Sequence, residues 1–263
     1  MAPRNGLESP RKMRFDEQNW EWPMEYLIGV AISACMVIPL VAASVGVDRD
    51  RTATLWALLF LGLVILDQAL LYLPIQTGID GYFGLHWNWF GKLFVLAWAV
   101  PFIVFGPISV SDVGLRAPLR HAFARAAMIV AILAIVAFLV HWFMRTGEPR
   151  TAGTVLFQLI MPAIAEELVF RGVLFAVLQK AFREPPSADP KWWKSRAVWL
   201  TAIAFALIHG WTVVGGTLEF NALACISPFV FGVIAGALRK YSGSVAFPIV
   251  LHSAVDVAAA VFP

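Results

Sequence analysis

Residues 164–172 read Ile-Ala-Glu-Glu-Leu-Val-Phe-Arg-Gly, and they place three ionisable side chains inside an apolar run from about Gly153 to Phe182. A charge near the centre of a bilayer costs about 2.5–3.5 kcal/mol on insertion scales, so three cost about 8–10 kcal/mol if nothing compensates. A sequence keeps such a cluster only where the groups pair, meet water or take part in chemistry. This stretch therefore predicts a polar site inside a membrane protein.

The composition of the whole chain agrees with that prediction. Of 263 residues, 60% are hydrophobic and only 14% are charged, and the mean hydropathy is +0.75. Soluble domains are about 45–50% apolar and about 25% charged. Spans of about 20 residues with short loops predict an all-α, polytopic membrane helix bundle of about eight transmembrane helices. The excess basic residues suit lipid headgroups, so we expect the membrane lipid bilayer as a partner and no nucleic acid.

The chain divides into three parts: a polar N-terminal tail at 1–22, N-terminal transmembrane helices at 23–110, and a core at 111–263. Prolines at 101 and 107 predict that the third span is kinked or incomplete. Pro162 lies one turn before the charged cluster and is expected to weaken the helix there and admit water. The predicted spans run over residues 24–47, 53–75, 91–108, 122–143, 153–182, 197–208, 221–238 and 245–262.

Basic residues gather in alternate loops, and the positive-inside rule puts those loops in the cytoplasm. The tail, with four basic residues, would then lie outside, which the same rule disfavours. The orientation of the chain in the membrane therefore stays open. The two signals would agree if one segment, such as the proline-containing third, did not cross the bilayer. The loop residues are Arg49, Arg51, Arg116, Arg120, Arg125, Lys180, Arg183, Lys191, Lys194, Arg196, Arg239 and Lys240.

Within the cluster, Glu167 and Arg171 are four residues apart, so they share one helix face and can pair. Glu166 is rotated by about 100° from its neighbour and has no partner within its own turn. An unpaired carboxylate in an apolar pocket suits a general base. The alternative is that these charged groups form ion pairs whose only role is to hold helices together.

Two further spans carry titratable groups. His209 ends one apolar segment, and His252 and Asp256 share one face of another, where the carboxylate can orient the imidazole or both can face one ligand. Asp67 in the second span is more simply a structural hydrogen-bonding residue. Polar groups in membrane helices face the bundle interior, so these spans are expected to converge on a hydrolytic site. The Gly-rich loop 210–220 would form its lip and could gate access.

Three patterns together carry a family resemblance: Glu-Glu-x-x-x-Arg at 166–171, Phe-x-x-x-His at 205–209 and His-x-x-x-Asp at 252–256. In this order on separate spans they resemble the motifs of the CPBP family, the CAAX-protease and bacteriocin-processing (Abi) intramembrane endopeptidases. Asp-Val-Gly-Leu-Arg at 112–116 is similar to a segment found ahead of that family's core. The resemblance covers about residues 112–263.

The resemblance implies a role for each residue. Glu166 and His209 would activate a water, His252 and Asp256 would lie where charge develops on the carbonyl oxygen, and Glu167 with Arg171 would hold them in place. Relatives with Asn at the last position have a ready donor there. Asp256 donates only if protonated, which favours orienting His252 or binding a metal. Zinc stays an open alternative, with Glu166, His209, His252 and Asp256 as ligands by residue type.

The expected function is therefore an intramembrane endopeptidase, glutamate-type or metal-dependent, that cuts a membrane-anchored or lipidated (CAAX-type) protein. Its expected location is the plasma membrane of a prokaryote. Two alternatives remain: a proton-coupled transporter or channel, because buried Glu, His and Asp also form proton relays, and a non-catalytic binding or immunity protein on the same fold.

Overall fold

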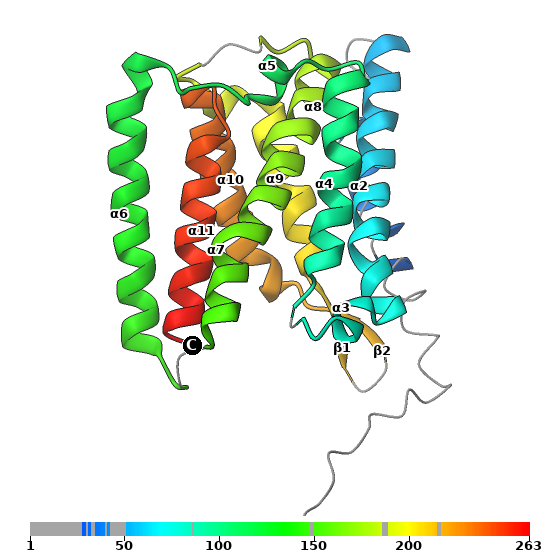
Figure 1. Ribbon diagram of the computed structural model, residues 1–263. Coiled ribbons are helices and arrows are strands. Elements are labelled where there is room, and N and C mark those ends of the chain that lie inside the picture. The colour runs from blue at the N-terminus through cyan, green and yellow to red at the C-terminus, as the bar shows by residue number, and fades with distance from the viewer. Residues whose placement is uncertain are drawn as a thin grey trace, which may run out of the picture.

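A computed structural model describes residues 51–263, except 86, 148–149, 186–188 and 215–216, and also residues 28–29, 31–32, 35–39 and 41–42. The polar tail at 1–22 and much of the first predicted span lie outside the described residues. The predicted all-α membrane bundle is confirmed, with one short β-hairpin added (Figure 1).

Three described helical stretches are long and apolar enough to cross a bilayer: Arg51–Tyr82, Arg120–Met144 and Leu223–Ser242. Three shorter apolar helices accompany them, and the count of eight spans stays a prediction. The elements are α2 (Arg51–Thr77), α3 (Ile79–Tyr82), α4 (Trp89–Phe105), α5 (Val110–Val113), α6 (Arg120–Met144), α7 (Ala152–Glu167), a π-helical segment (Leu168–Leu174), α8 (Phe175–Ala181), a 3₁₀ turn (Trp192–Lys194), α9 (Arg196–His209), β1 (Trp211–Val214), β2 (Thr217–Phe220), a 3₁₀ turn (Leu223–Cys225), α10 (Ile226–Ser242) and α11 (Ala246–Val261).

Neither Pro101 nor Pro162 interrupts its helix, so the third segment is not incomplete. Pro101 lies inside α4 and Pro107 beyond its end, so the third segment is one continuous helix of 17 residues. Pro162 likewise lies inside α7. The irregularity instead follows the two glutamates, where Leu168–Leu174 forms a π segment before the helix resumes as α8. Such segments are rare and frequent at functional sites, which suits this position in the chain.

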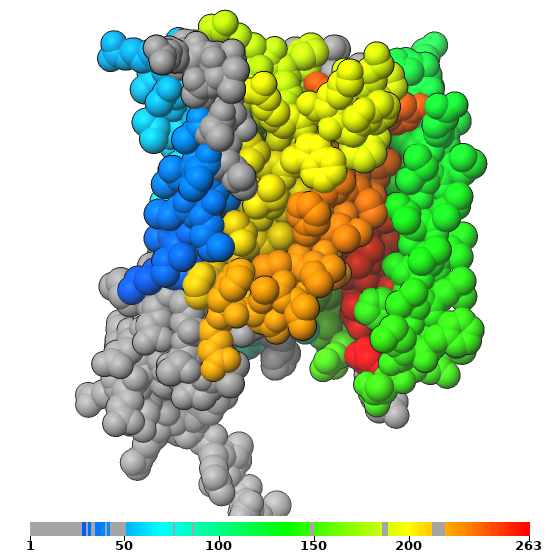
Figure 2. Space-filling model, turned by 180° about the vertical axis from the view of Figure 1, so that it is seen from behind, coloured from blue at the N-terminus to red at the C-terminus, as the bar shows by residue number. Residues whose placement is uncertain are grey.

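The continuous helix α7–α8 lies at the centre of the bundle (Figure 1). It packs against α11 and α4 through α7 and against α2 and α9 through α8. In the view from behind, α10 lies between α9 and α6, and α6 forms one outer side (Figure 2). Large apolar side chains on α6 face outward, as on a lipid-facing helix: Phe123, Ile132, Ile135, Leu139 and Phe143.

The Asp112–Arg116 stretch is hydrogen-bonded to the turn between α10 and α11. Arg116 Nε donates to the Gly243 carbonyl at 2.9 Å, and Ser244 Oγ donates to the Arg116 carbonyl at 2.6 Å. Burial alone would raise the pKa of the Asp112 carboxyl, but hydrogen bonds from Ser109 and the nearby Lys180 ammonium lower it below the ordinary value. The stretch therefore has a structural role that its sequence did not reveal.

Gly114 is held in a left-handed conformation, with φ at 79°. A Cβ at this position would also clash with the guanidinium of Arg239, because it would lie only 2.5 Å from Cζ. We expect Gly114→Ala to lower the free energy of unfolding by about 1–2 kcal/mol, the cost of a left-handed backbone for a residue with a Cβ. Denaturant titration in detergent measures this change.

The matched control is Gly62→Ala, because Gly62 is an exposed helical residue with nothing within 4 Å of an added Cβ. We expect it to leave stability equal or slightly higher, since Ala favours helix. Equal stability losses at positions 62 and 114 would contradict the proposed packing of the Gly114 turn.

Candidate active site

Local sequence signals place the predicted residues on three helices. Thr151 caps α7 by accepting from the Thr154 N–H, and Ser195 caps α9 in the same way from Val198. α7 therefore ends with Glu166 and Glu167, and α9 ends with His209 just before Gly210. α11 contributes His252 and Asp256 from the last segment of the chain.

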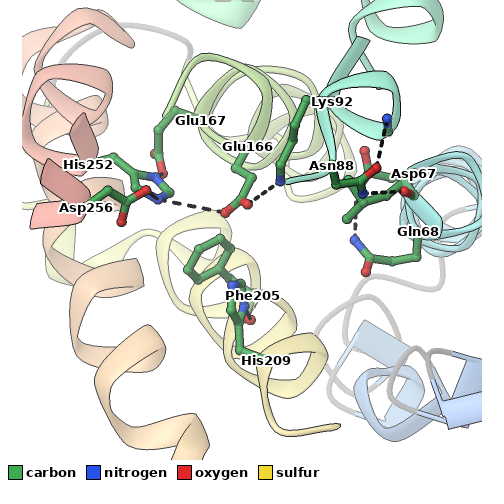
Figure 3. Close-up of polar contacts among 12 residues, drawn as sticks. Asp67, Gln68, Asn88, Lys92, Glu166, Glu167, Phe205, His209, His252 and Asp256 are labelled. Carbon is green, nitrogen blue, oxygen red and sulfur yellow. Dashed lines mark hydrogen bonds and ion pairs between the residues drawn. The ribbon is translucent and has the colours of Figure 1, made fainter. Parts of the chain in front are cut away.

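A cavity of about 380 Å³ gathers four of the six predicted residues from these helices: Glu166, His209, His252 and Asp256. Figure 3 shows their side chains pointing toward one another. Glu167 and Arg171 do not line the cavity but lie behind it, with no exposed side-chain surface. The structure thus brings the predicted set together in two layers, one facing the cavity and one buried.

The buried layer is an ion pair with an imidazole attached. Arg171 Nη1 donates to Glu167 Oε1 at 3.0 Å, so the predicted pair is present. His252 Nδ1 lies 2.7 Å from the same oxygen and donates its proton to it. Glu167 holds the Nδ1 side of the ring, and the predicted partner Asp256 lies 3.4 Å from the other nitrogen, Nε2. A carboxylate behind an imidazole fixes its tautomer and its direction.

Phe205, the first residue of the Phe-x-x-x-His pattern, covers this pair. The Arg171 guanidinium carbon lies 4.3 Å from the centre of its ring, a cation–π distance. The centre of the His209 ring lies 4.3 Å from the centre of the Phe205 ring. A Cβ at Gly232 of α10 would meet Ala202 and Arg171, so the small residue allows α10 to approach. The motif residues thus enclose the charge of Arg171 in aromatic and small side chains.

Glu166 has a partner that the sequence did not predict. Lys92 Nζ of α4 lies 2.5 Å from Glu166 Oε1, and both side chains are largely buried. Local spacing gave Glu166 no partner, but a helix far away in the sequence supplies one. A lysine in the first turn of an apolar segment was the available signal, because a charge inside a span needs a partner.

The second oxygen of Glu166 has no hydrogen-bond donor among the described residues. His252 Nε2 lies 3.9 Å from this oxygen. His209 donates from Nδ1 to the Phe205 carbonyl at 2.7 Å, since a carbonyl only accepts, and its Nε2 is left as an acceptor in the neutral ring. The structure describes no direct bond between Glu166 and His209, so a bridging water is how they would act together.

Two more carboxylates border the cavity. Asp256 Oδ2 lies 3.4 Å from His252 Nε2, on the ring edge opposite Glu167. Asp67 is buried and accepts a hydrogen bond from Gln68 Nε2 at 2.9 Å, the structural role predicted for it. Its side chain lines the same cavity from α2. Lys92 and Arg171 offset part of this negative charge, as buried charges require.

The four residues named as possible zinc ligands do not form a metal site in this arrangement. In the described part of the chain, no group of three or more His, Cys, Asp or Glu side chains is placed to hold a metal ion. The Lys92 ammonium also occupies Oε1 of Glu166, where it would repel a cation. The geometry gives no support to a metalloprotease.

The candidate site is therefore a polar cavity of about 380 Å³, walled by apolar helices and lined by carboxylate and imidazole groups. Residues 148–258 match the family described as Type II CAAX prenyl endopeptidase Rce1-like. This match confirms the predicted resemblance of the core to the CPBP (CAAX-protease) family of membrane-embedded endopeptidases. The matched region contains all six predicted site residues and excludes Lys92. No curated protein and no solved structure matches the chain.

Proposed function

We propose that this protein hydrolyses a peptide bond of a membrane-anchored protein with a water activated by Glu166 and His209. One observation carries the proposal: Glu166, His209 and His252 come from three helices and line one cavity. Hydrolysis needs water at bilayer depth, and a polar cavity supplies the space for it. The lipidated CAAX class is the substrate chemistry that the family suggests, and the prokaryotic plasma membrane remains the expected location.

The reaction follows from the hydrogen-bonding directions. The water donates one hydrogen to Glu166 Oε2 and the other to His209 Nε2, which leaves its lone pair for the carbonyl carbon. As the C–O bond forms, Glu166 takes one proton. The oxyanion is stabilised by the His252 Nε2–H and the Lys92 ammonium. Glu166 then returns its proton to the leaving nitrogen as the C–N bond breaks, giving an amine and a carboxylic acid. The acid loses the second proton of the water to His209 Nε2 and leaves as a carboxylate.

Asp256 and Glu167 have supporting roles in this mechanism. Glu167 holds one side of the His252 ring, and Asp256 lies beside the other nitrogen at 3.4 Å. A pair of carboxylates favours a ring that carries protons on both nitrogens, which is the form that can donate to an oxyanion. Asp256 therefore acts on His252 and does not itself need to donate.

In the proposed mechanism Lys92 positions Glu166 and supplies positive charge to the cavity. We therefore expect Lys92→Met to lower kcat by about 10- to 100-fold, with a smaller change in KM. Each tenfold loss of kcat corresponds to roughly 1.4 kcal/mol of activation free energy. Met keeps the length and apolar packing of the stem. Lys92→Arg should retain most of the activity because it keeps the cation. Steady-state cleavage by reconstituted protein measures both. Equal losses in the Met and Arg variants would contradict a charge-based role.

The proposed function is tested with purified protein in lipid vesicles and a set of membrane-anchored peptides, with mass spectrometry of the products. We expect a single internal cleavage that persists with a zinc chelator, because the catalytic steps use only side chains and water. Proton flux without cleavage would favour the transporter alternative. Binding of peptides without cleavage or flux would favour the binding protein.

A further inference from the structure

A second hollow lies on the outer side of the bundle, between α6, α10 and the 3₁₀ turn before α9. Its volume is about 460 Å³, within the range of about 300–1,000 Å³ that ligand sites have. No described residue lines both this hollow and the cavity of the candidate active site. α6 packs mainly against α11 and less closely against α10, which leaves space between α6 and α10 (Figure 2). We call it the α6–α10 groove, and its lining includes Arg125, Ile129, Leu133, Trp192, Ala237 and Tyr241.

The groove is polar at one end and apolar along the rest of its length. α6 begins beside the end of α10, because the Leu119 N–H donates to the Ser242 carbonyl at 3.1 Å. Arg125 and Tyr241 therefore lie toward the same end of the groove. Leu133 is eight residues further along α6, which is about 12 Å of helix. Beyond Tyr241, every described lining residue of α10 is apolar. This shape suits an elongated amphiphile with its polar group at one end.

The polar end of the groove carries an excess of positive charge. Arg125 is exposed, and no described carboxylate pairs with it. Lys191 and Lys194 are also exposed, and they flank Trp192, which lines the groove. One carboxylate opposes these cations: Asp189 accepts from the Lys191 backbone N–H at 2.8 Å, and its own N–H donates to a carbonyl in the last turn of α10 at 3.1 Å. Three cations and one carboxylate leave this end positive.

Two aromatic residues indicate the depth of the polar end in the membrane. Trp192 and Tyr241 are half-buried and line the groove beside its cations. Trp and Tyr favour the headgroup level of a bilayer, and the long stem of Arg lets its charged group reach the same level. The polar end of the groove is therefore at headgroup depth, and the apolar part is at the depth of the acyl chains.

We propose that the α6–α10 groove binds an anionic diacyl phospholipid, with the phosphate beside Arg125 and an acyl chain along Ile129 and Leu133. Basic pockets between membrane helices bind such headgroups, and a guanidinium matches a phosphate with paired donors. A zwitterionic lipid brings an ammonium group toward Lys191 and Lys194, which repel it. The bound lipid fills the space between α6 and α10 and so stabilises the position of α6. The site is separate from the proposed peptidase site, and its test needs no cleavage.

Native mass spectrometry of the full chain in detergent measures this binding with lipids that share the same acyl chains. We expect phosphatidylglycerol to bind with a Kd at least about fivefold lower than that of phosphatidylcholine. Arg125→Gln should raise the Kd for phosphatidylglycerol by about five- to tenfold, because it removes one basic group from the headgroup site. Equal Kd values of the two lipids for the native protein would overturn the proposal.

The matched control is Arg145→Gln. Arg145 directly follows α6 at its other end, is exposed and does not line the groove. We expect this variant to bind phosphatidylglycerol as the native protein does. Added phosphatidylglycerol should also raise the midpoint of thermal unfolding, by less in Arg125→Gln than in Arg145→Gln. Equal effects of the two substitutions on the Kd would mean that binding is not localised at the groove.

The apolar part of the groove is tested by filling it. Ala237→Phe places a ring in the space of the acyl chain, so we expect a Kd for phosphatidylglycerol at least about fivefold higher although every charge is kept. Ala131→Phe is its control, because Ala131 is an exposed residue of α6 at similar depth that does not line the groove. Thermal unfolding without added lipid shows whether both variants fold. An unchanged Kd in folded Ala237→Phe protein would contradict an acyl chain in the groove, and the Arg125 series decides the question if Ala237→Phe does not fold.

The same spectra distinguish other occupants of the groove. Displacement of phosphatidylglycerol by inorganic phosphate would indicate a site for a free anion. Displacement by a lipidated peptide, with equal affinity in the native and Arg125→Gln proteins, would indicate a site for the lipid chain of a substrate. A doubled protein mass in place of bound lipid would indicate a second copy of the chain. Each of these three results would overturn the proposal.

Discussion

Glu166→Gln is expected to lower kcat for peptide cleavage by about 10²- to 10⁴-fold, the usual contribution of a general base. Gln keeps the size of the side chain, but its amide cannot take a proton from water. The Lys92 contact at 2.5 Å would lose its ionic partner at the same time. Single-turnover cleavage in lipid vesicles measures the effect separately from product release.

The matched control is Glu219→Gln, because Glu219 is an exposed carboxylate of β2 near the same end of the bundle. It should leave cleavage unchanged. Thermal unfolding of both variants in detergent shows whether folding is preserved. Full activity in a folded Glu166→Gln protein would contradict its role as the base.

Arg171→Met is expected to lower the free energy of unfolding by about 3–5 kcal/mol, the cost of removing one partner from a buried ion pair. Arg171 and Glu167 have no exposed side-chain surface, so water cannot replace the lost guanidinium at the Glu167 carboxylate. Met is chosen because it fits the aromatic surroundings of Phe205. Denaturant titration in detergent measures the change.

The double variant Glu167→Gln with Arg171→Met separates charge from packing. If the pair is the source of the effect, the double variant should be more stable than the sum of the two single losses predicts, with a coupling of about 1–3 kcal/mol. Strict additivity would mean that Arg171 contributes through packing alone, and a single-variant loss below about 0.5 kcal/mol would contradict the buried ion pair.

The parts of the site that local spacing determines could be predicted from the sequence. Glu167 and Arg171 lie four residues apart on one helix, and the helix geometry alone brings them within 3.0 Å. His252 and Asp256 follow the same rule and lie 3.4 Å apart. The helices also begin and end within a few residues of the predicted spans wherever the structure describes them, because apolar runs in a membrane protein have few other solutions.

Contacts between distant helices could not be predicted in this way. Nothing in the spacing tells that Lys92 meets Glu166, 74 residues later, or that Glu167 and not Asp256 holds His252 Nδ1. That α4 and α7 continue through Pro101 and Pro162 also depends on their neighbours, because packed helices in a bundle let a helix continue through proline. The π segment after Glu167 has no sequence signal that we can name.

The central claim is that carboxylate and imidazole groups from three helices hold a water that splits an amide. Cleavage in ¹⁸O-labelled water tests it most directly. We expect the reconstituted protein to place one ¹⁸O atom in the new C-terminal carboxylate of the product, and the Glu166→Gln variant to form no labelled product above background. Labelled product formed equally by both proteins, or no product from the native protein with any membrane-anchored peptide, would contradict the claim.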